Sequence, residues 1–234
     1  MNEESPNFKA RLAAFFYLLV FVTGGLGFYV GGKFLEMRDP AAAAANILAH
    51  ETAFRLGSVF TLIATVCYIV VTALFYDLFK RVNKSVSLTA AFASLIGCAL
   101  GAVSLGFQAA APLILKDAYY SSAFTLEQVR AMAFVFLKLS LQVSNISLVF
   151  FGVYCFLIGC LIFGSNFLPR ILGVAMMIAG IGWLTFLWPP LVNYLAPYNF
   201  IPGMLGEASL TLWLLVMGVN AERWKQQLIP VPEH

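Results

Sequence analysis

Long apolar stretches separated by short polar connections dominate the chain and set its predicted architecture. Most stretches reach the ~20 residues that an α-helix needs to cross the ~30 Å hydrocarbon core of a bilayer. Backbone groups in that environment must be hydrogen-bonded within the segment, so we interpret all of them as helices. The pattern predicts an all-α polytopic membrane protein whose six transmembrane helices occupy approximately residues 10–33, 55–79, 86–115, 131–163, 170–188 and 201–222.

The polar connections predict further helical structure outside the membrane. Asp39 followed by Pro40 is typical of an N-cap acid with proline at the first helical position, and predicts a short external helix over residues 40–50. Thr125 and Gln128 have the spacing of a capping box. A helix over residues 126–163 would be about 57 Å long. We therefore expect the third and fourth transmembrane helices to project outward and to form a small external helical cap with helix 40–50.

The composition agrees with a membrane protein. The chain has 234 residues, of which 61% are hydrophobic and 11% charged, and its mean hydropathy is +0.87. Soluble domains carry about 25% charged residues. We expect residues 1–234 to form a single six-helix domain in the lipid bilayer. The net charge is only +3 and the basic residues are scattered, which argues against a nucleic-acid partner.

Basic residues are distributed unevenly between the two sides of the predicted helix bundle. One side has eight basic residues, whereas the other side has five, and each of these five has acidic residues nearby in sequence. The positive-inside rule therefore predicts that both chain termini are cytoplasmic. The eight basic residues on the predicted cytoplasmic side are Lys9, Arg11, Lys80, Arg81, Lys84, Arg170, Arg223 and Lys225.

Cysteine and tryptophan occur in or next to the apolar stretches. The four cysteines form no disulfide framework or metal-binding spacing, and buried free cysteine behaves as a small hydrophobic residue. We predict no metal site and no cofactor. Tryptophan is frequent where helices leave the membrane, so we interpret the four tryptophans of the chain as interfacial anchors. These residues are Cys67, Cys98, Cys155 and Cys160, and Trp183, Trp188, Trp213 and Trp224.

Glu207 is the most informative polar residue because it lies within the sixth apolar stretch, in its non-cytoplasmic half. An ionisable group there needs a partner or a function. We hypothesise that Glu207 pairs with Arg55 or Lys138. Lys138, Gln142 and Asn145 follow i, i+4, i+7 spacing and share one helical face, which we expect to point into the bundle. The alternatives are a structural ion pair, the polar floor of a ligand or lipid pocket, and a proton or ion relay.

His50 is the one histidine apart from the C-terminal residue, and it limits the enzyme classes to consider. The sequence has no HExxH, GxSxG, P-loop or GxGxxG motif, so we predict no catalytic residues. A sparse metal site of His50, Glu51 and Glu207 is an alternative, but a surface histidine near a helix end is the preferred interpretation.

Four segments of the chain carry a family resemblance: ARLAAFFYLL at 10–19, ANILAHETAFRLG at 45–57, SNFLPRILGVAMMIAGIGWL at 165–184 and GEASLTLWLLVMGVN at 206–220. They resemble one family of multi-pass membrane proteins from bacteria, called domain of unknown function 4386. The resemblance implies a six-helix fold in the plasma membrane, which is the inner membrane of a bacterium, and by its name the family brings no established activity. Asn46, Arg55, Arg170 and Glu207 fall within the similar segments without an assigned role.

Three functions from different classes follow from these features. The leading hypothesis is a non-enzymatic protein whose outer half binds a lipid-like or small apolar ligand, or a partner membrane protein. The second is a small proton- or ion-coupled transporter, acting alone or as a homo-oligomer, with Glu207 as the coupling carboxylate. The third is a membrane enzyme of unfamiliar chemistry that uses Glu207 and His50 as acid and base. The proposed binding residues are Glu207, Arg55, Lys138, Gln142, Asn145 and His50.

Overall fold

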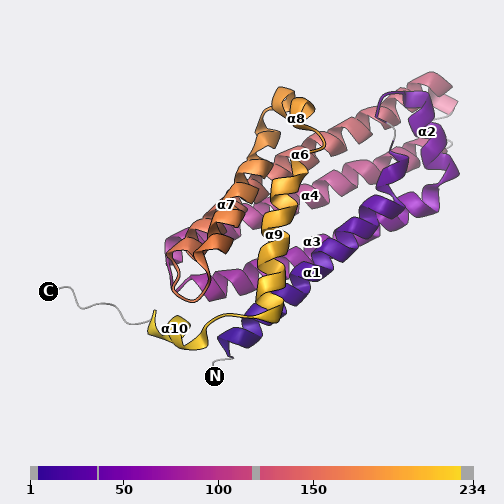
Figure 1. The fold of residues 1–234 in the computed structure, drawn as a ribbon. Helices are drawn as coiled ribbons and strands as arrows, with labels where there is room; N and C mark the ends of the chain where they lie inside the picture. The colour runs from indigo at the N-terminus through magenta and orange to yellow at the C-terminus, as the bar shows by residue number, and fades with distance from the viewer. Residues whose placement is uncertain (1–4, 36, 118–121, 228–234) are drawn as a thin grey trace. The chain divides into compact units, whose positions relative to one another are not determined.

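In the computed structural model, residues 5–35, 37–117 and 122–227 are described, and they fold mainly into α-helices (Figure 1). The long helices are α1 (Pro6–Val30), α3 (Glu51–Phe79), α4 (Lys84–Lys116), α6 (Leu126–Gly164), α7 (Arg170–Leu184) and α9 (Phe200–Val216). The short ones are α2 (Pro40–Ala49), α8 (Pro189–Leu195) and α10 (Ala221–Gln226), with 3-10 turns η1 (Gly32–Phe34) and η2 (Thr185–Leu187).

The helices confirm an all-α polytopic membrane protein. Within the described residues, five helices are long and apolar enough to cross a membrane: α1, α3, α4, α6 and α7 with its η2 extension. A sixth span is present if α8 and α9 count as one, although these two helices are bent by 80° at their junction. Pro189 begins α8 at a position where a helix tolerates proline, because the first backbone N–H groups have no intrahelical acceptor.

Glycine at position 218 shortens the sixth predicted span. Gly218 has a φ of 68°, in the left-handed region that favours glycine, and its N–H donates to the carbonyl of Trp213. This capping geometry ends α9 at Val216, six residues before the predicted boundary at residue 222. Helical structure resumes at α10, whose N-cap residue Asn220 accepts a hydrogen bond from the backbone N–H of Arg223.

The chain divides into two compact units, and α1, α3, α4 and α6 each contribute residues to both. The first unit contains Met1–Leu18, Cys67–Gly97 and Ile146–His234, and the second contains Leu19–Val66 and Cys98–Asn145.

The second unit contains the predicted cap helices. The Asp39 side chain accepts hydrogen bonds from the backbone N–H groups of Ala41 and Ala42, as the N-cap pattern predicts. Thr125 and Gln128 bond each other's backbone N–H groups reciprocally, which confirms the capping box. One apolar cluster joins α2, the start of α3, the end of α4 and the start of α6; it consists of Ala43, Ile47, Phe54, Ala111, Ile114, Val129, Ala133 and Leu137.

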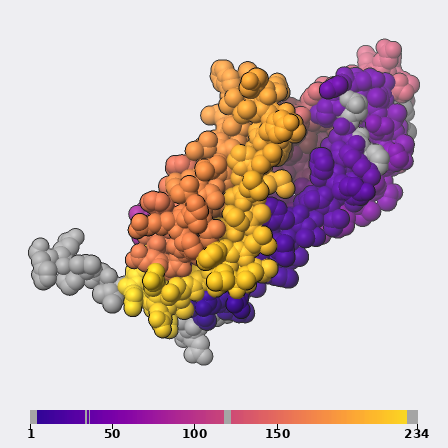
Figure 2. Space-filling model, viewed as in Figure 1, coloured from indigo at the N-terminus to yellow at the C-terminus, as the bar shows by residue number. Residues whose placement is uncertain are grey.

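In the first unit, small residues allow close helix packing. A Cβ on Gly159 or Gly173 would collide with the backbone of the opposite helix, so α6 and α7 touch at these glycines. Gly206 of α9 meets Ala175 and Ala179 of α7 in the same way. Figure 2 shows α7 and α9 lying side by side on the visible face. This packing brings side chains of α7 and α9 within hydrogen-bonding distance of each other.

Candidate functional site

Glu207 lies near the middle of α9, seven residues after Phe200 and nine before Val216. Its side chain is only 7% exposed, so it points into the first unit and away from the surroundings. In the predicted span of residues 201–222 this carboxyl lay nearer to one end, because that span continued to residue 222. A central, buried carboxyl needs hydrogen-bond donors from neighbouring helices.

Four neutral side chains on four other helices provide those donors. The hydroxyl oxygen of Tyr17, on α1, lies 2.6 Å from Oε2 of Glu207, and that of Tyr68, on α3, lies 3.4 Å from the same oxygen. The Nε1 atom of Trp183, on α7, lies 2.6 Å from Oε1. The Sγ atom of Cys155, on α6, is a weaker donor at 3.6 Å. We call these five residues the Glu207 cluster.

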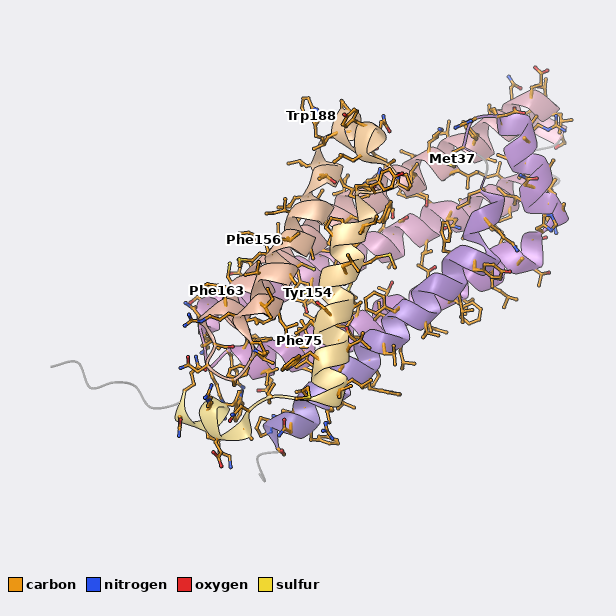
Figure 3. The ribbon with its side chains drawn as sticks, in the orientation of Figure 1. Met37, Phe75, Tyr154, Phe156, Phe163 and Trp188 are labelled. Atoms are coloured by element: carbon orange, nitrogen blue, oxygen red, sulfur yellow. The ribbon has the colours of Figure 1, made fainter. Side chains whose placement is uncertain are left out.

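Aromatic packing holds the two tyrosines in place. The rings of Tyr17 and Tyr68 meet edge to face with centroids 5.4 Å apart, and their hydroxyl oxygens are 3.2 Å apart. Tyr17 also packs edge to face against Phe75, and Tyr68 against Tyr154. Figure 3 labels Phe75 and Tyr154, the two rings that pack against these tyrosines. Because these rings are packed on several sides, the hydroxyl groups stay directed toward the carboxyl.

Trp183 reaches the cluster through a gap left by glycine. A Cβ on Gly203, one turn before Glu207 on α9, would overlap the indole ring of Trp183. Trp183 is 9% exposed and Trp224 is 3% exposed, and Trp224 donates to the carbonyl of Leu78. The prediction that both are interfacial anchors is therefore wrong, since their indole N–H groups have acceptors inside the protein. Trp188 is 65% exposed, in keeping with an anchor (Figure 3).

The two carboxyl oxygens of Glu207 differ in whether they can carry the proton of the carboxylic acid. The indole N–H of Trp183 can only donate, so Oε1 remains an acceptor. The hydroxyl groups of Tyr17 and Tyr68 can each donate or accept. A proton on Oε2 can therefore donate to Tyr17, while Tyr17 donates to Tyr68, without any movement of heavy atoms. The hydrogen bonds of the cluster are compatible with both a carboxylate and a carboxylic acid.

Arg55 and Lys138, the expected basic partners of Glu207, lie in the second unit and have partners there. Arg55 pairs with Glu51 at 2.9 Å, one turn away on α3, and Lys116 pairs with the same carboxylate. The Nζ atom of Lys138 donates to the carbonyl of Met37 at 2.5 Å. Within the described part of the chain, the Glu207 carboxyl has only neutral donors. This corrects the hypothesis of a basic partner, because hydroxyl, indole and thiol groups occupy the positions where a cation was expected.

The polar face of α6 that packs inward is not the predicted one. Lys138 and Gln142 are exposed and Asn145 is half-buried. The neighbouring face carries Ser140, which is buried and bonds Ser104 of α4 through its carbonyl and hydroxyl oxygens. Helical spacing identifies residues that share a face but not the face that is buried, and small serine side chains permit closer helix contact than lysine or glutamine.

His50 lies at the C-terminal end of α2 in the second unit, with an exposed side chain. The four side chains that contact the Glu207 carboxyl all belong to the first unit and do not include a histidine. Glu51, the other acid of the alternative metal site, forms ion pairs with Arg55 and Lys116. The acid and base roles suggested for Glu207 and His50 gain no support from these contacts.

Sequence reasoning missed Tyr17, Tyr68 and Trp183, and treated Cys155 only as a hydrophobic residue. One available signal was the tyrosine hydroxyl in the middle of an apolar span, since such a group needs a hydrogen-bond partner in hydrocarbon. The partner itself was not identifiable, because it lies on another helix 190 positions away from Tyr17.

A small cavity of about 150 Å³ lies in the second unit, and none of the predicted binding residues is among those that line it. It combines hydroxyl and amide groups with apolar side chains. Two of its lining residues on α6, Leu137 and Leu141, directly precede the predicted Lys138 and Gln142 in sequence. The lining residues are Leu35, Met37, Ser104, Gln108, Leu137, Ser140, Leu141 and Ser144.

Comparisons with known proteins identify a family for this chain. An uncharacterized protein of Archaeoglobus fulgidus is 30% identical over 80 residues, which are 33% of this chain and 47% of that protein. The chain thus spans about half the length of that curated relative. No solved structure matches the chain. A model of the family described as a domain of unknown function, DUF4386, matches residues 12–218. Because this match covers most of the sequence, this integral membrane protein belongs to the DUF4386 family.

Proposed function

We propose that this protein is a small proton-coupled transporter in which Glu207 binds and releases the coupling proton. The observation that carries this proposal is the buried carboxyl, whose hydrogen bonds suit either protonation state and whose described partners are all neutral. Intramembrane carboxyl groups that face the interior of a helix bundle are typical of proton relays. A group that only linked helices would not need to tolerate two protonation states.

A second buried polar group supports a route to this carboxyl. Asn199 precedes α9 and is 4% exposed, and its two amide atoms have no hydrogen-bond partner among the described residues. An unsatisfied buried amide costs about 1–3 kcal/mol unless water or a ligand binds it. Asn199, Gly203 and Glu207 are spaced by four residues and so follow one side of α9. Water bound at Asn199 would form the outer part of such a route, and the indole of Trp183, which packs against Gly203 and bonds Glu207, lies between that water and the carboxyl.

We further propose that the protein resides in a bacterial plasma membrane with both termini in the cytoplasm. Contacts within the first unit support a common location for the basic residues. Lys9 and Lys80 both pair with Asp77, and the Arg11 guanidinium donates to the carbonyl of Val216 at 3.4 Å. The start of α1, the end of α3 and the end of α9 therefore meet at one end of this unit, where the positive-inside rule applies. Labelling of single-cysteine variants with a membrane-impermeant reagent in intact cells tests this orientation.

The decisive experiment measures protonation of Glu207 and then flux. Infrared difference spectra of the full-length protein in liposomes, recorded between acidic and alkaline pH, report the carbonyl band of a protonated carboxyl. We expect a band that is absent in Glu207→Gln and retained in Glu222→Gln, which removes an exposed carboxylate on α10. An identical spectrum in Glu207→Gln would contradict the assignment of the proton.

Flux measurements separate a coupling role from a structural one. A glutamine at position 207 can accept from Trp183 and donate to Tyr17, so this variant should fold and remain stable. Proteoliposomes are loaded with a pH-sensitive dye, and small organic cations and acids are added in turn as candidate solutes. For the wild type, we expect at least one solute to drive proton uptake. Uptake should be lost in Glu207→Gln and kept in Glu222→Gln. Unchanged coupled uptake in Glu207→Gln would reject the transporter proposal.

The cavity in the second unit favours a second candidate function, the binding of a small apolar ligand with a hydroxyl group. Its volume of about 150 Å³ lies below the roughly 300–1,000 Å³ of drug-sized ligand sites, so a whole lipid is too large. The hydroxyls of Ser104 and Ser140 supply polar contacts on one wall. Ser140→Leu should fill the cavity and abolish binding of a fluorescent aliphatic alcohol, whereas Gln142→Leu on the exposed face should not.

A further inference from the structure

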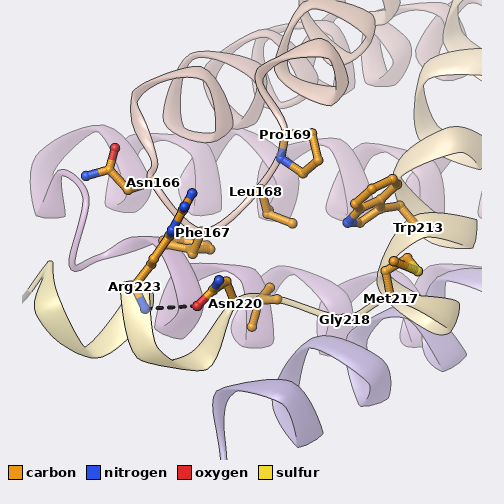
Figure 4. Close-up of a pocket in the computed structure, with 10 residues that line it drawn as sticks. Asn166, Phe167, Leu168, Pro169, Trp213, Met217, Gly218, Asn220 and Arg223 are labelled. Atoms are coloured by element: carbon orange, nitrogen blue, oxygen red, sulfur yellow. Dashed lines mark hydrogen bonds between the residues drawn. The ribbon is translucent and has the colours of Figure 1, made fainter.

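A cavity of about 310 Å³ lies in the first unit, in a region that the Glu207 cluster does not use (Figure 4). It is formed where the segment before α7 meets the end of α9 and the start of α10. The backbone N–H of Asn220 donates to the carbonyl of Phe167 and holds these two segments together. The lining residues are Asn166, Phe167, Leu168, Pro169, Trp213, Met217, Gly218, Val219, Asn220 and Arg223.

The polar groups of this cavity are mainly hydrogen-bond donors. The guanidinium of Arg223 has no ion-pair partner among the described residues, and Figure 4 shows its side chain extending from α10 toward the 166–169 segment. Asn220 uses its Oδ1 to accept from the backbone of Arg223, which leaves its amide N–H groups able to donate. The side chain of Asn166 and the indole N–H of Trp213 likewise have no hydrogen-bond partner in the described chain. Among the residues that the structure describes, no acidic one lines the cavity, so it is suited to an anion.

The remaining walls of the cavity are apolar and adjoin a membrane-spanning helix. Leu168, Pro169 and Met217 line it together with the ring of Trp213. Met217 and the adjacent Val216, at the end of α9, are 61% and 67% exposed. A ligand that combines a phosphate with long hydrocarbon chains would place the phosphate among the donors and the chains along this exposed apolar surface. Basic pockets at helix ends are typical headgroup sites for anionic lipids.

We propose that this pocket binds the phosphate-bearing headgroup of an anionic phospholipid, with Arg223 as its charge partner. The guanidinium supplies charge-assisted hydrogen bonds to phosphate oxygens, and the Asn166, Asn220 and Trp213 donors orient the headgroup. The acyl chains then lie against the outer face of α9. This site is independent of proton binding at Glu207.

Native mass spectrometry of the full-length protein in detergent tests the proposal, with dioleoylphosphatidylglycerol and dioleoylphosphatidylcholine as probes. We expect retention of the anionic lipid in preference to the zwitterionic one. Arg223→Gln should weaken binding of the anionic lipid about tenfold, as expected for loss of a charge-assisted contact. Lys225→Gln is the matched control, because it removes the same charge from an exposed position of α10 outside the pocket. Trp213→Phe, which keeps the ring and removes one donor, should give a smaller loss of about threefold.

The outcomes are distinct. Equal loss of lipid in Arg223→Gln and Lys225→Gln would show general surface attraction and overturn the site. Equal retention of the anionic lipid by wild type and Arg223→Gln would also overturn it. Glycerol phosphate serves as the soluble competitor. If it displaces the anionic lipid at equal concentration, the ligand is a soluble phosphate compound and the lipid assignment fails; if a large excess is needed, the acyl chains contribute and the assignment holds.

Discussion

The indole N–H of Trp183 donates to Glu207 across 2.6 Å, although the two residues lie 24 positions apart on α7 and α9. The contact exists because Gly203 leaves space for the indole ring beside α9. It links the packing of these two helices to the protonation chemistry of the carboxyl, because Trp183 fixes Oε1 as an acceptor and leaves Oε2 for the proton.

Loss of the indole donor should destabilise the first unit. Trp183→Phe keeps an aromatic ring but leaves Oε1 with only the weak Cys155 donor. We expect a decrease of about 1–3 kcal/mol in the free energy of unfolding, because a buried acceptor loses its main partner. Trp188→Phe, at a 65% exposed position, should change stability by less than about 0.5 kcal/mol. Denaturant titration in detergent micelles measures both, and equal effects would contradict the importance of the Trp183 contact.

The two tyrosines of the cluster should differ in their contributions. Tyr17 lies 2.6 Å from Oε2 of Glu207, whereas Tyr68 lies 3.4 Å from it. Tyr17→Phe should therefore lower the free energy of unfolding by about 1–2 kcal/mol, and Tyr68→Phe by about 0.5 kcal/mol. In the infrared experiment, Tyr17→Phe should also shift the carbonyl band of protonated Glu207 more than Tyr68→Phe does. The reverse order in either measurement would contradict the hydrogen-bond geometry.

Gly203 should be intolerant of any side chain. A Cβ at this position overlaps the Trp183 ring, so Gly203→Ala must displace the indole and break its hydrogen bond to Glu207. We expect a loss of at least about 2 kcal/mol from overpacking and the unmade bond together. Gly25→Ala is the matched control in another transmembrane helix, because the added Cβ would meet none of the described residues within 4 Å apart from its own helical turn. Its thermal unfolding temperature should be unchanged or slightly higher.

The short helix α2 should depend on its N-cap. Asp39→Ala removes the acceptor for the backbone N–H groups of Ala41 and Ala42 and should cost about 1 kcal/mol of local stability. Asp39→Asn retains an acceptor oxygen and should have a much smaller effect. Hydrogen exchange of the α2 amides, followed by mass spectrometry, detects the difference. Equal protection in the two variants would indicate that packing of Ala43 and Ile47 alone maintains the helix.

Much of the fold was predictable because it depends on local properties of the sequence. Apolar stretches long enough to cross a bilayer must form helices, since no water is present to satisfy the backbone there. The caps at Asp39 and Thr125 were recognisable because they involve residues only two or three positions apart. The end of α9 was missed because the left-handed conformation of Gly218 is one of several that glycine can adopt.

The sequence alone determined that the chain is a helical membrane protein and that a carboxyl at position 207 is embedded in it. Those conclusions follow from hydropathy and helix length, which are properties of contiguous segments. Only the tertiary structure decided which groups meet that carboxyl. The choice between Arg55 or Lys138 and the neutral Tyr17 and Trp183 depends on how far each helix is rotated about its axis. That rotation is set by close contacts of small residues such as Gly203 and Gly206 with another helix, and periodicity does not specify the partner.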